Sequence, residues 1–268
     1  MNRISNGPVA VEVLADQLEL DAQASLHLTG PAIGSNYSVA GARAYGSEAI
    51  DLATQILMFQ ANHGYMAPPD ALYVLFIGGN DLRDARDTGD PVAARDRVRA
   101  ATAEVARAVS TLAQSGARSF LVVNAPDIAM SPETRLLAAA LDQPDLIKGA
   151  DRLSRLYRRQ MHHHVKQLVH EQGIQIIEFD LFSFFNQLIK NARHLGFTNN
   201  SDACFSAETF SFHPDCNFGL NFDDFVYFDE FHPTARVYAM VGEALFRALD
   251  KKHLENYFIL PDQTLVAE

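Results

Sequence analysis

The segment FDEFHPT, residues 228–234, places a carboxylate and an imidazole three positions apart, in Asp229 and His232. A carboxylate that binds one nitrogen of an imidazole leaves the other nitrogen free to accept a proton from a nucleophile. The pair is therefore a candidate for general-base chemistry. The same residues also suit a helix-capping loop, because an acidic side chain favours a helix start and Pro233 fits a first turn.

A second segment, VLFIGGND, ends an apolar run at Gly78 and Gly79 and continues with Asn80. Glycine allows backbone conformations that are closed to other residues. An amide side chain at such a turn can donate a hydrogen bond to a developing oxyanion. Gly41, in NYSVAGARA, would offer a bare backbone N–H to the same charge. Each segment alone also fits an ordinary turn.

These residues lie between alternating apolar and amphipathic segments, which is the pattern of an α/β protein with a mainly parallel sheet. Continuous apolar runs predict strands buried on both faces, and a period near 3.6 residues predicts helices. Strands are expected within 71–79, 119–127 and 174–182, and from residue 225. Helices are expected within 7–20, 47–64, 92–117, 144–173 and 180–197, and after Pro233. Residues 34–46 are expected to be a loop around a short strand.

The carboxyl ends of parallel strands meet at one edge of a sheet, where functional loops gather. Both the segment around Asn80 and the segment of Asp229 and His232 follow a predicted strand. We therefore expect the two segments to contribute to one site.

The order of these segments resembles the GDSL (SGNH) ester hydrolases, most closely their lipase, lecithinase and haemolysin-like branch. The resemblance spans about residues 3–248 and rests on SNGPVAVEVLADQL, NYSVAGARA, IGGNDL, VVNAPDIAMSPE and DEFHPTARVYAMVGEAL. It implies a flavodoxin-like three-layer α/β/α sandwich with a mainly parallel sheet, as one domain over residues 1–268. It also implies hydrolysis of carboxylic esters, including lipase, phospholipase or lysophospholipase activity, through an acyl-enzyme.

Position by position, the resemblance implies a role for each polar residue of these segments. His232 is the implied catalytic base and Asp229 the acid that orients it. Asn80 is the implied side-chain donor of the oxyanion hole and Gly41 a backbone donor, while Asp81 gives structural support. No metal or organic cofactor is implied, because acyl transfer of this type needs none. The implied partner is a small-molecule or lipid ester.

The family's nucleophile block, Gly-Asp-Ser, does not occur in this sequence. In the family that block lies on the first, central strand, some tens of residues before a segment like the one at Met1. Loss of that strand would leave buried backbone groups unpaired, each costing about 1–3 kcal/mol. Residues 256–261, NYFILP, are the segment apolar enough to take its place. The nucleophile is unassigned, since the early serines fit turns or caps: Ser5, Ser35, Ser38 and Ser47.

Three explanations of the missing block remain open. Either the start was assigned too late, after an export signal and the block, or the gene is truncated, or the chain is a non-catalytic relative that binds lipid or acyl groups. No signal peptide opens the chain as written, and no apolar run has the length of a membrane span. The resemblance implies a secreted or periplasmic location for a full-length form.

Composition and motifs also narrow the classes of binding partner. The net charge is −11 and the pI about 5.3, which argues against a nucleic-acid partner, because nucleic acids require basic patches. FIGGND matches neither the dinucleotide fingerprint nor a phosphate-binding P-loop. No pattern in the sequence predicts the oligomeric state.

One loop holds both cysteines of the chain, Cys204 and Cys216. They either form a disulfide, as in an oxidising compartment, or remain free thiols, and their spacing fits no zinc motif. The loop is similar to an insertion in the haemolysin-like members of the family. Three interpretations fit the phenylalanines around this loop. They line a pocket for an acyl chain, they touch a membrane surface transiently, or they pack in the core.

Overall fold

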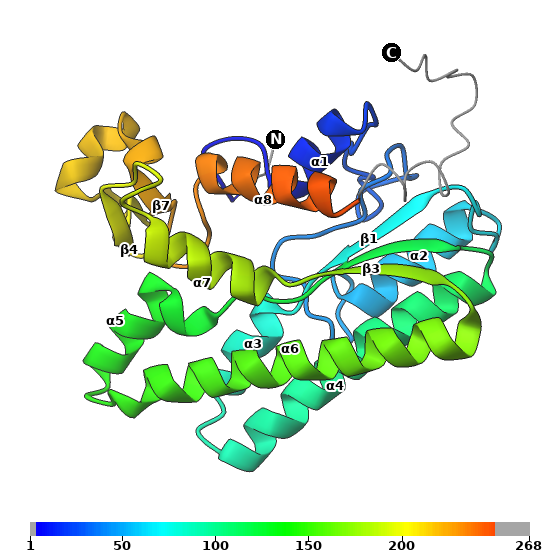
Figure 1. Ribbon diagram of the computed structural model, residues 1–268, viewed down its shortest axis with the longest axis horizontal. Coiled ribbons are helices and arrows are strands. Elements are labelled where there is room, and N and C mark those ends of the chain that lie inside the picture. Colours follow the sequence, from blue (N-terminus) through cyan, green and yellow to red (C-terminus); the bar gives the residue numbers. More distant parts are fainter. Residues whose placement is uncertain (1–3, 250–268) are drawn as a thin grey trace.

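The structure is a computed structural model that describes residues 4–249. Its centre is a three-stranded sheet in the order β1-β2-β3 (Figure 1). The strands are β1 Leu72–Phe76, β2 Ser119–Val123 and β3 Gln175–Phe179. Both strand pairs are parallel. On its other edge, β1 has no strand partner among the residues that the structure describes.

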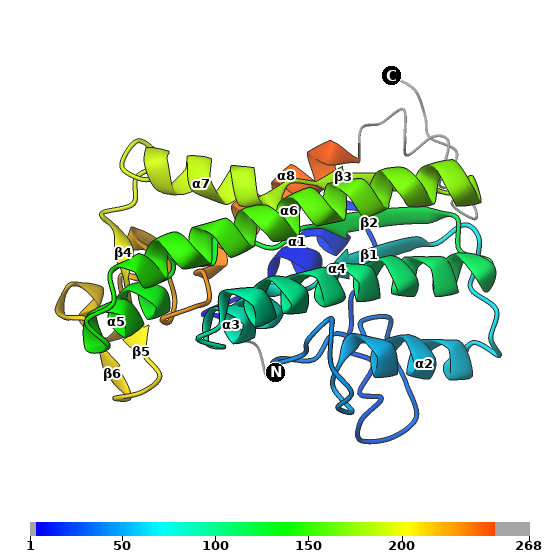
Figure 2. The same cartoon turned by 90° about the horizontal axis from the view of Figure 1, so that it is seen from below.

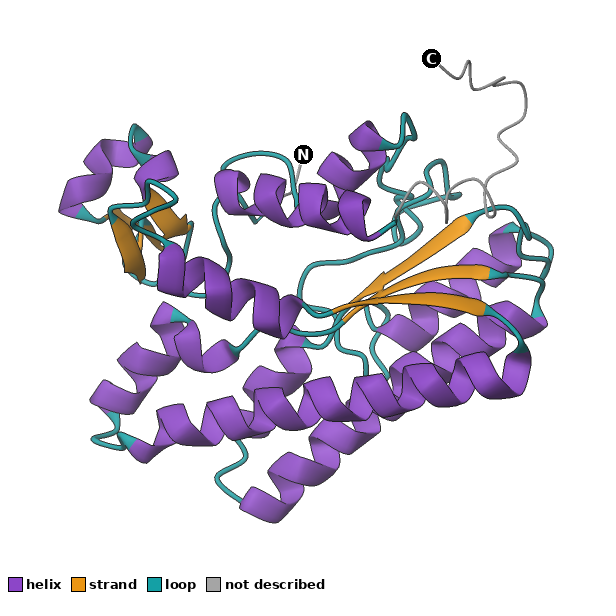
Figure 3. Ribbon diagram, in the orientation of Figure 1, coloured by secondary structure: helices purple, strands orange, loops and turns teal. Residues whose placement is uncertain are grey.

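Helices cover both faces of this sheet (Figures 1 and 3). They are α1 Ala10–Gln17, α2 Leu52–Asn62, α3 Gly79–Arg86, α4 Pro91–Gln114, α5 Pro132–Ala140, α6 Asp145–Gln172, α7 Leu181–Asn191 and α8 Ala235–Ala248. One face packs against α1, α7 and α8, and the other against α2, α3, α4 and α6. The predicted α/β/α sandwich with a mainly parallel sheet is confirmed.

Alternate residues of each strand supply the two cores, because successive side chains point to opposite faces. In β2, Phe120 and Val122 face the α4 and α6 side, while Leu121 and Val123 face the α1 and α8 side. All five residues of β2 are buried. The continuous apolar run of this strand therefore reflects burial on both faces.

A smaller region, here called the disulfide lobe, comprises residues 199–224 and lies at one end of the molecule (Figure 2). It contains β4 Asn199–Ala203, β5 Phe205–Ser206 and β6 Ser211–Phe212, with 3-10 turns at Pro214–Gly219 and Phe222–Asp224. β5 and β6 form an antiparallel pair. β4 pairs in parallel with β7 Phe225–Tyr227, the strand that leads into Asp229.

The amino-terminal segment is tied to α8, the helix that follows His232. The Asn6 side chain accepts a hydrogen bond from the backbone N–H of Ala235 at 2.8 Å, which caps the start of α8. α1 approaches α8 so closely that a Cβ on Gly242 would lie 2.6 Å from Val13. These contacts fix the position of α8 and hence the end of the loop that carries His232.

The structure adds to or departs from the sequence analysis in three places. Residues 34–46 contain no strand, only an isolated bridge between Asn36 and Ala24, because carboxylates satisfy the N–H groups of this segment. β7 belongs to a separate two-stranded sheet, not to the main one. The segment after Gly78 is the first turn of α3 and not a plain loop.

Residues 256–261, considered as a replacement strand, lie outside the described residues. Within residues 4–249, no helix has both the length and the apolar character needed to cross a membrane.

Candidate active site

The loop of Asp229 and His232 is a tight turn between β7 and α8. The backbone N–H of Phe228 donates to the carbonyl of His232 at 2.8 Å and so closes the turn. Inside it, Oδ1 of Asp229 accepts the backbone N–H groups of Phe231, at 2.9 Å, and of His232, at 2.6 Å. Thr234, fully buried, donates its hydroxyl to the carbonyl of Phe225 at 3.0 Å. The three-residue spacing thus corresponds to a turn that the carboxylate itself stabilises.

This turn aligns the imidazole with the carboxylate. Nδ1 of His232 lies 2.9 Å from Oδ2 and 3.0 Å from Oδ1 of Asp229. Burial alone would raise the pKa of Asp229, but the hydrogen bonds and charge of His232 and the N–H of Phe231 hold that pKa below its ordinary value. Asp229 is therefore ionised at neutral pH. An ionised partner on Nδ1 favours the tautomer whose Nε2 can accept a proton.

Asn80 lies in the first turn of α3. Gly78 caps this helix with a φ of 120°, and a Cβ there would overlap the hydroxyl of Tyr157, so glycine is required twice over. Nδ2 of Asn80 donates to the carbonyl of Ala42 at 2.9 Å. Its Oδ1 accepts a hydrogen bond from Arg83 at 3.3 Å. Since an amide nitrogen carries two hydrogens, one donor of Asn80 remains for a ligand.

The loop of Gly41 is fixed by the residue after Asn80. Gly41 has a φ of 84°, and Ala42, which binds Asn80, follows it directly. The fully buried carboxylate of Asp81 accepts the N–H groups of Ala44, at 2.8 Å, and Tyr45, at 2.9 Å. Burial raises the pKa of Asp81 despite these hydrogen bonds. Asn80 and Asp81 thus bring the loop of Gly41 to the start of α3.

The candidate site has two halves: the turn of Asp229 and His232, and the start of α3 with the loop of Gly41. The ring of Phe231 connects them. A Cβ on Gly79 would lie 3.5 Å from this ring, so the start of α3 and the Asp229–His232 turn are in contact. The guanidinium of Arg83 lies over the same ring at 4.7 Å. The structure therefore brings Asn80 next to the loop of Gly41 and places the start of α3 against the loop of His232.

Sequence reasoning missed a group of charged residues that supports both halves. The carboxylate of Glu133, at the start of α5, binds Arg83 and also Arg86, whose side chain is 2% exposed. The backbone N–H of Glu133 donates to the carbonyl of Glu230, at 2.8 Å, in the turn of residues 228–232. We call this turn the catalytic turn, after the role that the family resemblance implies for it. Burial would raise the pKa of Glu133, but the two arginines lower it overall. The spacing Asn80-x-x-Arg83, one helical turn, is the signal that could have revealed the first contact.

The structure does not assign the nucleophile. Among residues 4–249, no hydroxyl is hydrogen-bonded to Nε2 of His232. A serine bonds a histidine elsewhere, where the hydroxyl of Ser25 lies 2.7 Å from Nδ1 of His27, but these residues are only 1% and 7% exposed. The same described residues contain no cluster of three or more His, Cys, Asp or Glu side chains able to hold a metal ion.

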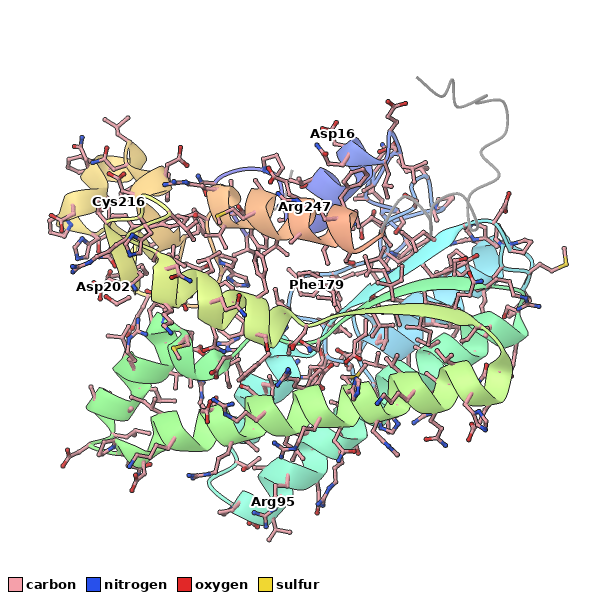
Figure 4. All side chains as sticks on the ribbon, viewed as in Figure 1. Asp16, Arg95, Phe179, Asp202, Cys216 and Arg247 are labelled. Atoms are coloured by element: carbon pink, nitrogen blue, oxygen red, sulfur yellow. A yellow bond between two sulfur atoms is a disulfide. The ribbon has the colours of Figure 1, made fainter. Side chains whose placement is uncertain are left out.

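Cys204 and Cys216 lie in the disulfide lobe and are joined by a disulfide. Both are fully buried and form a small core with Phe225 and Phe222. Figure 4 shows Cys216 and Asp202 at this end of the molecule. The lobe adjoins the catalytic turn through β7 but supplies no polar contact to the imidazole of His232 among the described residues.

Comparison with known proteins identifies a family and a plant relative. The family described as GDSL-like Lipase/Acylhydrolase matches residues 2–245. A GDSL esterase/lipase from Arabidopsis thaliana is 23% identical over 142 residues, which are 52% of this chain and 39% of that protein. The match thus spans well under half of the plant relative.

Proposed function

Given that the chain belongs to the GDSL-like lipase/acylhydrolase family, a family of ester hydrolases, we propose that His232 acts as the general base of ester hydrolysis and Asp229 orients it. The observation that carries this proposal is the pairing of Nδ1 of His232 with a buried, ionised carboxylate at 2.9 Å. That arrangement directs the base function to Nε2. The substrate class is a carboxylic ester, including the acyl esters of lipids.

In the proposed reaction a serine hydroxyl attacks the ester carbonyl while Nε2 of His232 takes its proton. The imidazolium that forms is stabilised by Asp229 and then returns the proton to the leaving alcohol. Water hydrolyses the acyl-enzyme by the same sequence of proton transfers. The serine is not assigned to a residue of this chain.

The charge that develops on the carbonyl oxygen is received by Asn80 and Gly41. The free hydrogen of the Asn80 amide and the backbone N–H of Gly41 are the proposed donors. A donor of this kind contributes about 3–4 kcal/mol to the transition state. Arg83 and Ala42 hold the amide from both sides, so its direction is set before the substrate binds.

The test uses residues 1–268 joined at Met1, through a connecting segment of the family's length, to a strand that ends in Gly-Asp-Ser. We call this protein the serine-bearing form. Hydrolysis of p-nitrophenyl esters is measured with acyl chains of several lengths. His232→Ala should reduce kcat by about 10⁴-fold, because the base is lost. His213→Ala is the matched control, since His213 also lies near an aspartate, Asp215, at 3.8 Å. Full activity of the His232 variant would remove that residue from the mechanism.

The absence of a hydroxyl at Nε2 among residues 4–249 favours a second candidate, in which the chain as written binds lipid or acyl groups without turnover. A fluorophosphonate probe and intact-mass measurement of residues 1–268 separate the two. An adduct that His232→Ala prevents would identify a serine within this chain. A folded sample without an adduct would support the binding function.

A further inference from the structure

The most exposed large apolar side chains of residues 4–249 all lie in the disulfide lobe. Phe218 is 86% exposed, Phe210 81% and Leu220 80%. The next in exposure is Met66, at 73%, in the connection between α2 and β1 at the opposite end of the molecule (Figure 1). All three therefore belong to one lobe of the molecule, and exposed large apolar side chains that gather in one region mark a contact surface.

Two of these three residues have an unusual backbone conformation. Phe210 and Phe218 have φ values of 52° and 53°, a left-handed conformation that residues with a side chain rarely adopt. Beneath them, the Cys204–Cys216 disulfide and the fully buried Phe225 form the base of the lobe. We call Phe210, Phe218 and Leu220 the apolar tip.

A series of ring contacts connects the apolar tip with the catalytic turn. Phe218 contacts Phe212, whose ring lies 5.3 Å from that of Phe205. Phe205 in turn lies 6.2 Å from Phe228, the residue before Asp229. An apolar path therefore leads from the tip to the residue beside the proposed catalytic acid.

The charges of the lobe determine which surface the tip fits. Residues 199–224 contain no Lys, Arg, Trp or Tyr. The acidic residues of the lobe are Asp202, Glu208, Asp215, Asp223 and Asp224. Anionic membranes attract basic segments, so this lobe is repelled by them. Protein interfaces are anchored mainly by Trp, Tyr and Arg, which are absent here.

We propose that the apolar tip inserts into the surface of a zwitterionic phospholipid layer and so places the catalytic turn beside lipid esters. The inference deepens the proposed function and rests on it for the nature of the substrate. Insertion itself requires no turnover. Binding can therefore be tested, and can fail, independently of ester hydrolysis.

The experiment exploits the absence of tryptophan from the sequence. Phe218→Trp introduces one fluorescent reporter at the tip of the full chain, and Met66→Trp introduces one at the far end as the matched control. Vesicles of phosphatidylcholine are added to each variant. We expect the emission of the Phe218→Trp protein to shift to the blue and to be quenched by brominated acyl chains, while the Met66→Trp emission stays unchanged.

A second variant keeps the test independent of the reporter. Phe210→Ser with Leu220→Ser in the Phe218→Trp protein should weaken vesicle binding by at least tenfold, because two apolar side chains no longer leave water. Circular dichroism should show unchanged folding, since both positions are exposed. Vesicles containing phosphatidylglycerol should bind more weakly than those of phosphatidylcholine alone.

Several results would overturn the proposal. One is an unshifted emission of Phe218→Trp with phosphatidylcholine, or an equal shift of both reporters. Another is stronger binding to anionic vesicles. A concentration-dependent blue shift of Phe218→Trp without lipid would mean that a second copy of the chain covers the tip instead.

Discussion

The catalytic turn and the disulfide lobe meet at Phe228, but different forces hold them. The turn and the start of α3 depend on buried charged and polar groups, with Asp81, Arg86 and Asp229 each no more than 7% exposed. The lobe depends on a disulfide and packed phenylalanines. Of its apolar side chains, Phe210, Phe218 and Leu220 point into solvent.

The difference fits the roles proposed for the two regions. A general base and an oxyanion donor work only in fixed directions, and directional hydrogen bonds provide that. Contact with a lipid surface needs exposed apolar area but no exact direction. The disulfide is therefore sufficient to hold the lobe that carries the apolar tip.

The largest expected effect tests whether ion pairs stabilise the region of the candidate site. Glu133→Ala removes the carboxylate shared by Arg83 and Arg86. The buried guanidinium of Arg86 then keeps the ion pair with Asp87 and the hydrogen bond to the hydroxyl of Thr134. We expect a loss of about 3–5 kcal/mol in the free energy of unfolding, measured in urea. Glu104→Ala is the control, because its partner Arg107 is 66% exposed; it should cost less than about 1 kcal/mol. Equal losses in the two variants would contradict the conclusion that the ion pairs of Glu133 stabilise this region.

A slightly smaller effect tests the covalent half of the comparison. Replacing Cys204 and Cys216 together with alanine opens a link between positions 12 residues apart. Closing a loop of this size contributes about 3 kcal/mol. Hydrogen exchange should accelerate in residues 199–224 while the amides of α3 keep their protection. Acceleration of α3 to the same extent would show that the two regions are not held separately.

Arg83 lies between the two halves of the site, so its replacement sharpens the comparison. Arg83→Lys keeps the charge but cannot bind Glu133 and Asn80 and stack on Phe231 at once. In the serine-bearing form we expect kcat to fall about tenfold with little change in KM, because Asn80 acts in the transition state. Arg99→Lys, at an exposed pair with Asp96, is the control. A change in KM alone would contradict a positioning role.

The smallest effect is on acid stability. Glu133 has a lowered pKa in the folded chain, so its contribution is fully present above its ordinary pKa, about 4, and is lost as pH falls through the folded value. Glu133→Gln lacks this contribution. Between pH 5 and pH 3 the free energy of unfolding should therefore fall less in the variant than in the parent. An identical fall would show that the carboxylate is not stabilised by its arginines.

Much of this arrangement was accessible from the sequence. Apolar runs located all three strands of the main sheet, since burial on both faces leaves an uninterrupted pattern. The pairing of Asp229 with His232 also follows from short-range spacing. Sequence motifs pointed to Asn80 and Gly41 as candidate site residues. They did not predict which residues hold Asn80 and the loop of Gly41 in place.

What sequence reasoning missed depends on long-range contacts. The strand expected within 34–46 is replaced by hydrogen bonds to Asp81, which lies more than 35 positions away. Glu133 reaches Arg83 across 50 positions. No local pattern encodes such contacts, so the loop of Gly41 and the support of Asn80 became visible only in three dimensions.

The central claim is that the loops of His232 and Asn80 act on one ester carbonyl. The direct test is the rate at which a fluorophosphonate labels the serine-bearing form, followed by intact mass. We expect one adduct in the parent, and labelling at least about 100-fold slower in both His232→Ala and Asn80→Ala, because the base and the oxyanion donor assist the same attack. Labelling of either variant at the parent rate would contradict the account.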